Sequence, residues 1–230
     1  INGGTVTDGT YKYTFTVKDS VGNEVTSKEY STTADSVVPA IATGKVKVSD
    51  TAYSALSSSW FNSNSTSIKG ETGAVTDAHL DLSVEVKTNN ASDGNFLMNS
   101  DGSFTSNRSI SDGKNTVVFT FKDEAGNTNA LSMQINVDAK VPTVSNMSLT
   151  ATGTDSVTKE GTVKVTLTAD DTNTGVDVSG LEKAWIGTKS GFTESEKLKE
   201  ITLSETSGGV TTYPVTKTVT NESVDISNDT

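Results

Sequence analysis

One segment of this sequence occurs twice. DGTYKYTFTVKDSVGN, residues 8–23, aligns without a gap with DGKNTVVFTFKDEAGN, residues 112–127. The similarity continues beyond each copy, where ADSVVP (34–39) matches VDAKVP (137–142) after the deletion of one residue. The copies are separated by roughly 100 residues, the size of one small β domain rather than of a solenoid repeat. The repeat therefore predicts a tandem array of similar domains.

Each copy has the pattern of an antiparallel hairpin. Apolar and polar residues alternate along the first strand, which is typical of a strand with one buried face. An Asp and a Gly-Asn pair follow; these residues cap backbone N–H groups in a turn and supply positive φ. The residues expected to face a core are Tyr13, Phe15 and Val17 in the first copy, and Val117, Phe119 and Phe121 in the second.

Other segments also alternate with a period of two. They are KVKV (45–48), LDLSVEVK (80–87) and GTVKVTLTAD (161–170), whereas only ESEKLKE (194–200) has a helical pattern. Many short strands with turn residues between them predict an all-β chain built of β-sandwiches.

The position of the repeat divides the chain into three parts. Residues 1–38 are expected to be the closing strands of one domain, 39–141 a complete domain, and 142–230 a domain without its final hairpin. The boundaries fall at Pro39 and Pro142, because a proline just after a strand stiffens the connection and does not extend the sheet.

Residues 101–127, DGSFTSNRSISDGKNTVVFTFKDEAGN, resemble the closing part of bacterial immunoglobulin-like repeats. The first copy keeps Asp19, Gly22 and Asn23 but has Val21 in place of alanine. The resemblance implies immunoglobulin-like sandwiches, the first and last incomplete here, on the bacterial cell surface. Such repeats form stalks of adhesins, surface-layer proteins and accessory regions of extracellular enzymes. The matching residues are Asp101, Gly102, Ser103, Phe104, Ile110, Gly113, Asn115, Thr116, Asp123, Ala125, Gly126, Asn127, Val137, Asp138 and Pro142.

The composition narrows the classes of partner. Hydrophobic residues make up 32% of the chain, which suits several thin cores better than one thick core. A net charge of −11 argues against nucleic acid, whose phosphates bind basic surfaces. No apolar run approaches the roughly 18 residues of a membrane span. The absence of cysteine excludes disulfides, thiolate metal sites and a cysteine nucleophile.

The sequence offers no pattern for catalysis. A serine–histidine–aspartate arrangement would have to use His79, the single histidine, which we expect to be an ordinary surface residue. Thin sandwiches also offer no obvious deep cleft for a pair of catalytic carboxylates. We therefore expect a protein that is not an enzyme.

A more specific hypothesis than a catalytic site is a calcium site at each joint between domains. In an immunoglobulin-like sandwich, the last hairpin loop and the loop after the second strand lie at the end where the preceding domain arrives. Acids gathered there would repel one another, and a bound Ca²⁺ would relieve the repulsion. The alternative is that these acids cap turns in water. The two expected groups are Asp35 with Asp123, Glu124 and Asp93, and Asp138 with Asp170 and Asp171.

Three functions follow from these features. The first is a structural module, a cell-surface stalk or adhesin segment made of tandem sandwiches. The second is a self-assembling surface-layer or filament subunit, in which residues 1–38 of one copy complete 142–230 of the next by strand addition. The third is a carbohydrate-binding accessory module, in which Trp60 and Phe61 stack on a sugar. The expected partners are neighbouring domains or copies of the same protein, and cell-surface glycans. The alternative for Trp60 is an ordinary core residue, and Trp185 is expected to be a core residue of a third strand.

Overall fold

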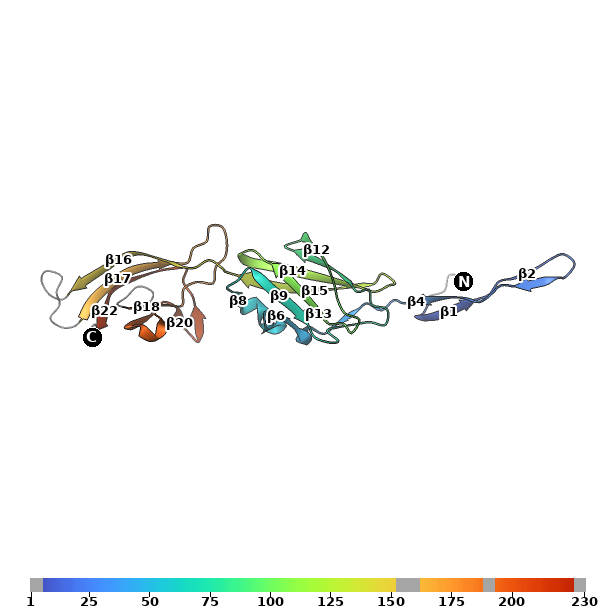
Figure 1. The fold of residues 1–230 in the computed structure, drawn as a ribbon, viewed down its shortest axis with the longest axis horizontal. Coiled ribbons are helices and arrows are strands. Elements are labelled where there is room, and N and C mark those ends of the chain that lie inside the picture. Colours follow the sequence, from blue (N-terminus) through green and yellow to red (C-terminus); the bar gives the residue numbers. More distant parts are fainter. Residues whose placement is uncertain (1–5, 152–161, 188–192, 226–230) are drawn as a thin grey trace. The chain divides into compact units, whose positions relative to one another are not determined.

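A computed structural model describes residues 6–151, 162–187 and 193–225 (Figure 1). Regular structure in these residues consists of β-strands and three short 3₁₀ helices, which confirms the all-β prediction. None of these helices is long or apolar enough to cross a membrane. The helical pattern predicted at 194–200 is wrong beyond its first turn, because the chain enters a strand at Lys199. The 3₁₀ helices are η1 (Thr43–Lys45), η2 (Tyr53–Ser58) and η3 (Glu194–Glu196).

The chain divides into two compact units. Strands β14 (Gly113–Lys122) and β15 (Thr128–Val137) run from one unit into the other. The three-part division of the sequence stays a prediction, and its outermost residues, 1–5 and 226–230, lie outside the described residues. The first unit is 1–57, 66–108 and 116–134, and the second is 58–65, 109–115 and 135–230.

The central part of the chain is a sandwich with open sheets, as expected of an immunoglobulin-like fold. In one sheet β14 lies between β11 and β15, and in the other β9 lies between β13 and β6. A short pair, β5 (Ala40–Ile41) with β10 (Val75–Thr76), lies outside both sheets. The first sheet has the order β12 (Ala91–Leu97), β11 (Ser83–Thr88), β14, β15, β8 (Trp60–Phe61), and the second β13 (Phe104–Ser109), β9 (Ser65–Gly70), β6 (Val46–Val48), β7 (Thr51–Ala52).

Four phenylalanines form the centre of this sandwich. Phe119 and Phe121 point inward from β14, as their alternation predicts, and both are 0% exposed. The ring of Phe104, on the facing sheet, lies 5.8 Å from each of them. Phe96 from β12 completes the group, with its ring 5.0 Å from that of Phe119. These contacts across the two sheets hold the layers together.

The first copy of the repeat forms an isolated two-stranded ribbon. Strands β1 (Gly9–Tyr13) and β4 (Tyr30–Ala34) pair, and β2 (Thr16–Lys18) pairs with β3 (Glu24–Thr26) (Figure 1). Phe15 is 63% exposed and Val17 65% exposed, so the prediction that they face a core is wrong within this chain. The same repeat positions are therefore buried in one copy and open to solvent in the other.

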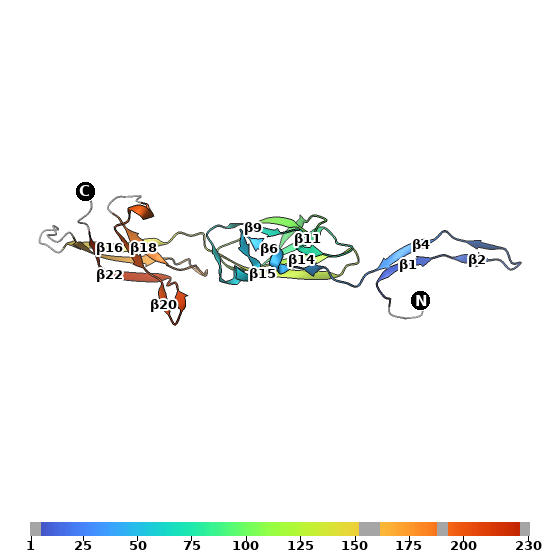
Figure 2. The ribbon, with the colours of Figure 1, turned by 90° about the horizontal axis from the view of Figure 1, so that it is seen from below.

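The C-terminal strands form smaller sheets around a second core. The face predicted for 161–170 is confirmed, since Val165, Leu167 and Ala169 are buried. Ile201 and Leu203 pack in the same cluster. The sheets are β16 (Thr143–Ala151), β17 (Thr162–Asp170), β22 (Thr216–Asp225); β18 (Lys183–Ile186), β19 (Lys199–Thr202); and β20 (Glu205–Ser207), β21 (Val210–Thr212) (Figure 2).

Neither tryptophan is a core residue, contrary to the expectation for both. Trp185 lies on β18, but Ala184 and Ile186 take the inward positions, so the indole points outward and Trp185 is 40% exposed. Its Nε1 donates to Glu200 Oε2 at 3.0 Å. Trp60 is half-buried on β8, where it pairs with Asn136 of β15.

The two copies of the repeat predict opposite responses to the same substitution. Phe119→Ala should destabilise the sandwich by about 3–5 kcal/mol, because it removes a buried aromatic ring. Phe15→Ala should change the free energy of unfolding by less than about 0.5 kcal/mol in dilute solution, because the ring is exposed. Urea unfolding followed by circular dichroism measures both. Equal losses would mean that the ribbon is packed on a core.

Candidate metal sites at two joints

The turn between β14 and β15 is capped by Asp123. Its Oδ1 accepts from the N–H groups of Gly126 at 2.6 Å and Asn127 at 2.8 Å, and its Oδ2 accepts from Asn127 Nδ2 at 2.7 Å. Burial raises the pKa of Asp123, but these hydrogen bonds outweigh it and the net shift is downward. The oxygens of Asp123 are thus engaged by the turn itself, and this predicted ligand is a structural cap.

The first joint comprises Asp35, Asp77, His79, Glu124 and Asn127. Asp35 Oδ2 lies 2.8 Å from His79 Nδ1, and Asn127 Nδ2 donates to the backbone oxygen of Asp35 at 3.0 Å. Glu124 N donates to the backbone oxygen of His79 at 2.8 Å. The structure therefore brings Asp35 to the hairpin that carries Asp123 and Glu124.

His79 is the feature of the first joint that the sequence did not reveal. It is an ion-pair partner rather than an ordinary surface residue, and one ligand atom each from Asp35, Asp77 and His79 lies within 4.8 Å of the others. The hydrogen bond that the imidazole donates to the carboxylate of Asp35 raises the pKa of His79. This donor set contains nitrogen, which suits a transition metal better than Ca²⁺.

Asp93 lies at the other end of the sandwich, so its assignment to the first joint is wrong. Its Oδ2 accepts from Thr88 Oγ1 at 3.1 Å. Thr88 pairs with Val117 of β14, about 20 Å along the strand from Asp123. The prediction assumed that the loop after 80–87 reaches this joint. The loop that does so follows β10 instead, and it carries Asp77.

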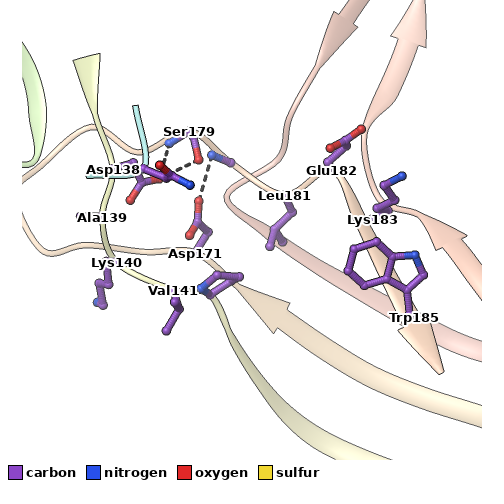
Figure 3. A pocket seen from close by; sticks show the side chains of 13 residues that line it. Asp138, Ala139, Lys140, Val141, Asp171, Ser179, Leu181, Glu182, Lys183 and Trp185 are labelled. Carbon is purple, nitrogen blue, oxygen red and sulfur yellow. Dashed lines mark hydrogen bonds between the residues drawn. The ribbon is translucent and has the colours of Figure 1, made fainter. Parts of the chain in front are cut away.

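The second joint is centred on Asp138, which directly follows β15. Asp138 is only 8% exposed, and its Oδ2 accepts from both the N–H and the hydroxyl of Ser179 at 2.7 Å (Figure 3). Among the described residues, no donor lies within hydrogen-bonding distance of its buried Oδ1. A buried carboxylate oxygen without a partner is costly and calls for a proton, a water or a cation.

Asp171 faces the same joint from the end of β17. It is 5% exposed, and its Oδ2 accepts from Gly180 N at 2.9 Å (Figure 3). Burial raises the pKa of Asp171, and the charge of Asp138 raises it further. The structure thus brings Asp138 and Asp171 together, as the topology predicts, and their mutual repulsion favours a shared proton or a bound cation.

Asp170 has a different role from its neighbour. Its Oδ1 accepts from Thr172 N at 3.1 Å and Thr216 Oγ1 at 3.0 Å, and its Oδ2 accepts from Thr172 Oγ1 at 3.0 Å. These bonds, the one from Thr172 N foremost, lower the pKa of Asp170. Asp170 therefore caps the turn after β17, which is the alternative reading that the sequence left open.

Sequence reasoning missed Asp112 at the second joint. Its Oδ1 accepts from Asn64 Nδ2 at 3.0 Å and Ala139 N at 3.2 Å, and its Oδ2 accepts from Asn173 Nδ2 at 3.2 Å. This one carboxylate links three loops of the second unit. Its place in the Ser-Asp-Gly turn before β14 is the only signal in the sequence, and such turns are common.

Comparison with known proteins identifies the central part of the chain. Residues 42–139 match the family model described as "Bacterial Ig-like domain", so this segment is a bacterial immunoglobulin-like domain. A search of curated proteins found no match to the chain. Domains of this family are typically non-enzymatic structural modules at bacterial surfaces.

The pKa of His79 tests the geometry of the first joint. Because the partner Asp35 raises this pKa, Asp35→Asn should lower it, and the ion pair should contribute to stability below the ordinary pKa of 6.5 and be lost as the pH rises through the folded value. NMR titration of the single imidazole measures the shift. Asp77→Asn should lower the pKa less, because Asp77 raises it only through its charge and Asp35 through a hydrogen bond to the ring. A wild-type pKa at or below 6.5 would contradict the pairing.

The pH dependence of Asp171→Asn tests the second joint. A carboxyl whose pKa is raised in the folded state binds its proton more tightly than in the unfolded chain, so its contribution to stability falls as the pH rises. In chelator at neutral pH, Asp171→Asn should therefore raise the melting temperature. The gain should shrink as the pH falls and vanish below the ordinary pKa of 3.8.

The matched control is Asp177→Asn, which removes the same charge from the same loop. The Asp177 side chain is 62% exposed and should leave the melting temperature almost unchanged. A decrease in melting temperature for Asp171→Asn across the whole pH range would show that its carboxylate is not under repulsion.

Proposed function

We propose that this chain is a non-catalytic segment of a bacterial surface protein, in which immunoglobulin-like sandwiches in series act as a stalk. The match of residues 42–139 to the bacterial Ig-like family supports this role. Asp123 and Asp170 cap turns, and Asp138 and Asp171 lie buried at the second joint, which suits structural rather than catalytic roles. The mechanism is mechanical, since each sandwich is a rigid unit and the connections between them limit bending.

The second joint is the place where bending would be limited. Asp138 and Asp171 are both buried, and Asp138 Oδ1 has no donor among the described residues. Ca²⁺ prefers carboxylate and carbonyl oxygens, with ligands at about 2.3–2.6 Å. A cation held by these two carboxylates would replace their repulsion with a link between the segment after β15 and the loop after β17. The proposal of a joint stiffened by calcium rests on this pair of buried carboxylates, Asp138 and Asp171.

The first joint is not proposed as a calcium site. Asp123 is occupied by its turn, and Asp35 is paired with the imidazole of His79. This joint is therefore held by an ion pair and hydrogen bonds, and its stiffness should depend on pH rather than on Ca²⁺.

Calorimetry in calcium and in chelator tests the proposal. At a free Ca²⁺ concentration one hundred times the dissociation constant, binding should stabilise the wild-type unit by about 2.7 kcal/mol. Asp171→Asn should lose this response even though it is the more stable protein in chelator. Asp177→Asn should keep it, and hydrogen exchange of residues 138–140 should slow in Ca²⁺ only where the response is kept.

Two outcomes would separate the parts of the proposal. Equal melting temperatures in calcium and in chelator would reject the cation and leave a shared proton to relieve the repulsion between the two carboxylates.

The surface location has a separate test. Antibodies raised against residues 40–138 should label intact cells that produce the protein. Labelling only after lysis would reject the surface location.

A further inference from the structure

The ribbon presents an apolar face that is open to solvent. Phe15 and Val17 lie on this face, and the ring of Tyr30 lies 6.2 Å from that of Phe15. The corresponding residues of the second copy, Phe119 and Phe121, are 0% exposed between the two sheets of the sandwich. The chain itself therefore shows what environment this hairpin sequence occupies when it is packed.

The C-terminal sheets expose the complementary surface. Val144 pairs with Ala169, and Leu149 pairs with Val165, so they share the inward face of their sheet. Val144 is nevertheless 54% exposed and Leu149 70% exposed. The valines of β6 in the central sandwich are covered, with exposures of 1% for Val46 and 0% for Val48. Among the described residues, no layer covers Val144 and Leu149 of β16 as one covers the valines of β6.

Strand β18 also has an edge without a neighbouring strand. Leu203 N donates to Glu182 O and Leu198 N donates to Ile186 O, so the even-numbered residues bond to β19. The backbone groups of Lys183 and Trp185 then point to the opposite edge. Among the described residues, no strand pairs with β18 on that side.

The central sandwich supplies the register for such a strand. Met98 N bonds to Leu82 O between β11 and β12, as Leu203 N bonds to Glu182 O between β18 and β19. Glu85 of β11 therefore corresponds to Trp185.

On its other edge β11 pairs with β14. There Glu85 lies opposite Thr120, and Val86 lies opposite Phe119. Through the sequence repeat, Thr120 corresponds to Thr16 and Phe119 to Phe15.

We propose that the ribbon of one copy, residues 9–34, pairs with β18 of a second copy and closes its C-terminal sandwich. Thr16 lies opposite Trp185, and Phe15 lies opposite Ile186 and covers the core that contains Leu167 and Ile201. The contact joins different surfaces of the two copies, so it propagates head to tail into a filament. It goes beyond the stalk proposed above and does not depend on the cation.

One pair of residues in this register is unfavourable. It brings Lys18 beside Lys183, and like charges on adjacent strands repel. Lys183 Nζ already has carboxylate oxygens of Glu194 and Glu200 at 3.9 Å, which balance its charge.

Cysteine pairs test the register directly, because the natural chain contains no cysteine. Thr16→Cys chains are mixed under mild oxidation with tagged Trp185→Cys chains, so that a mixed disulfide can form only between copies. Residues directly opposite on antiparallel strands lie at a Cα distance that a disulfide spans. The mixed dimer should form about tenfold faster than with the control variant described next.

The matched control is Thr26→Cys. Its hydroxyl lies 2.9 Å from that of Thr16, so it shares the same face of the ribbon, but it belongs to the strand that does not adjoin β18. Equal rates of crosslinking for Thr16→Cys and Thr26→Cys would overturn the proposal.

Light scattering of chains without cysteine gives an independent result. The mean mass of the wild-type protein should rise with concentration, and Phe15→Asp with Val17→Asp should keep it at one chain. Both side chains are exposed in the single chain, so these changes leave its own fold intact. A wild-type protein that stays monomeric at every concentration, or a variant that assembles equally well, would overturn the proposal.

Discussion

The structure depends on the burial of one hairpin inside the central sandwich. Strand β14 has neighbours on both edges, and its alternate side chains, Phe119 and Phe121, fill the space between the sheets. The same hairpin positions both joints. Its turn carries Asn127, which bonds to the backbone of Asp35, and its second strand leads directly into Asp138. The packing of the core and the placement of the joints therefore have a common origin.

The elements that could be predicted are those fixed by local chemistry. A period of two identifies which face of β14 and β17 is buried, and the Asp…Gly-Asn pattern identifies the turn. Trp185 shows the limit, because a shift of one residue reverses the face of a strand and β18 is too short to reveal its register. The pairing of Asp35 with His79 joins residues far apart in sequence, and nothing in either local pattern signals it.

At the joints, too, some residues could be placed from the sequence and others could not. Topology was sufficient to bring Asp138 near Asp171, because both follow strands that end at the same place. It was insufficient for Asp93, because its loop lies at the other end of the sandwich. The difference between Asp170, whose oxygens are saturated by threonines, and Asp171, whose carboxylate is buried beside another, depends on which way each side chain points. Adjacent residues on a strand point to opposite faces, so one caps a turn while the other faces the joint.

The turn of the repeat also bears on the order of folding. Asp19 Oδ2 accepts from Asn23 Nδ2 at 2.7 Å, the same distance as between Asp123 and Asn127, although one turn is exposed and the other is packed. All of these bonds span at most four residues, so the turn closes without help from distant strands. Hairpins form in about 1–10 μs, much faster than the long-range pairing of a sandwich. Each repeat thus contains a turn that can close before the remaining strands of the sandwich pair with it.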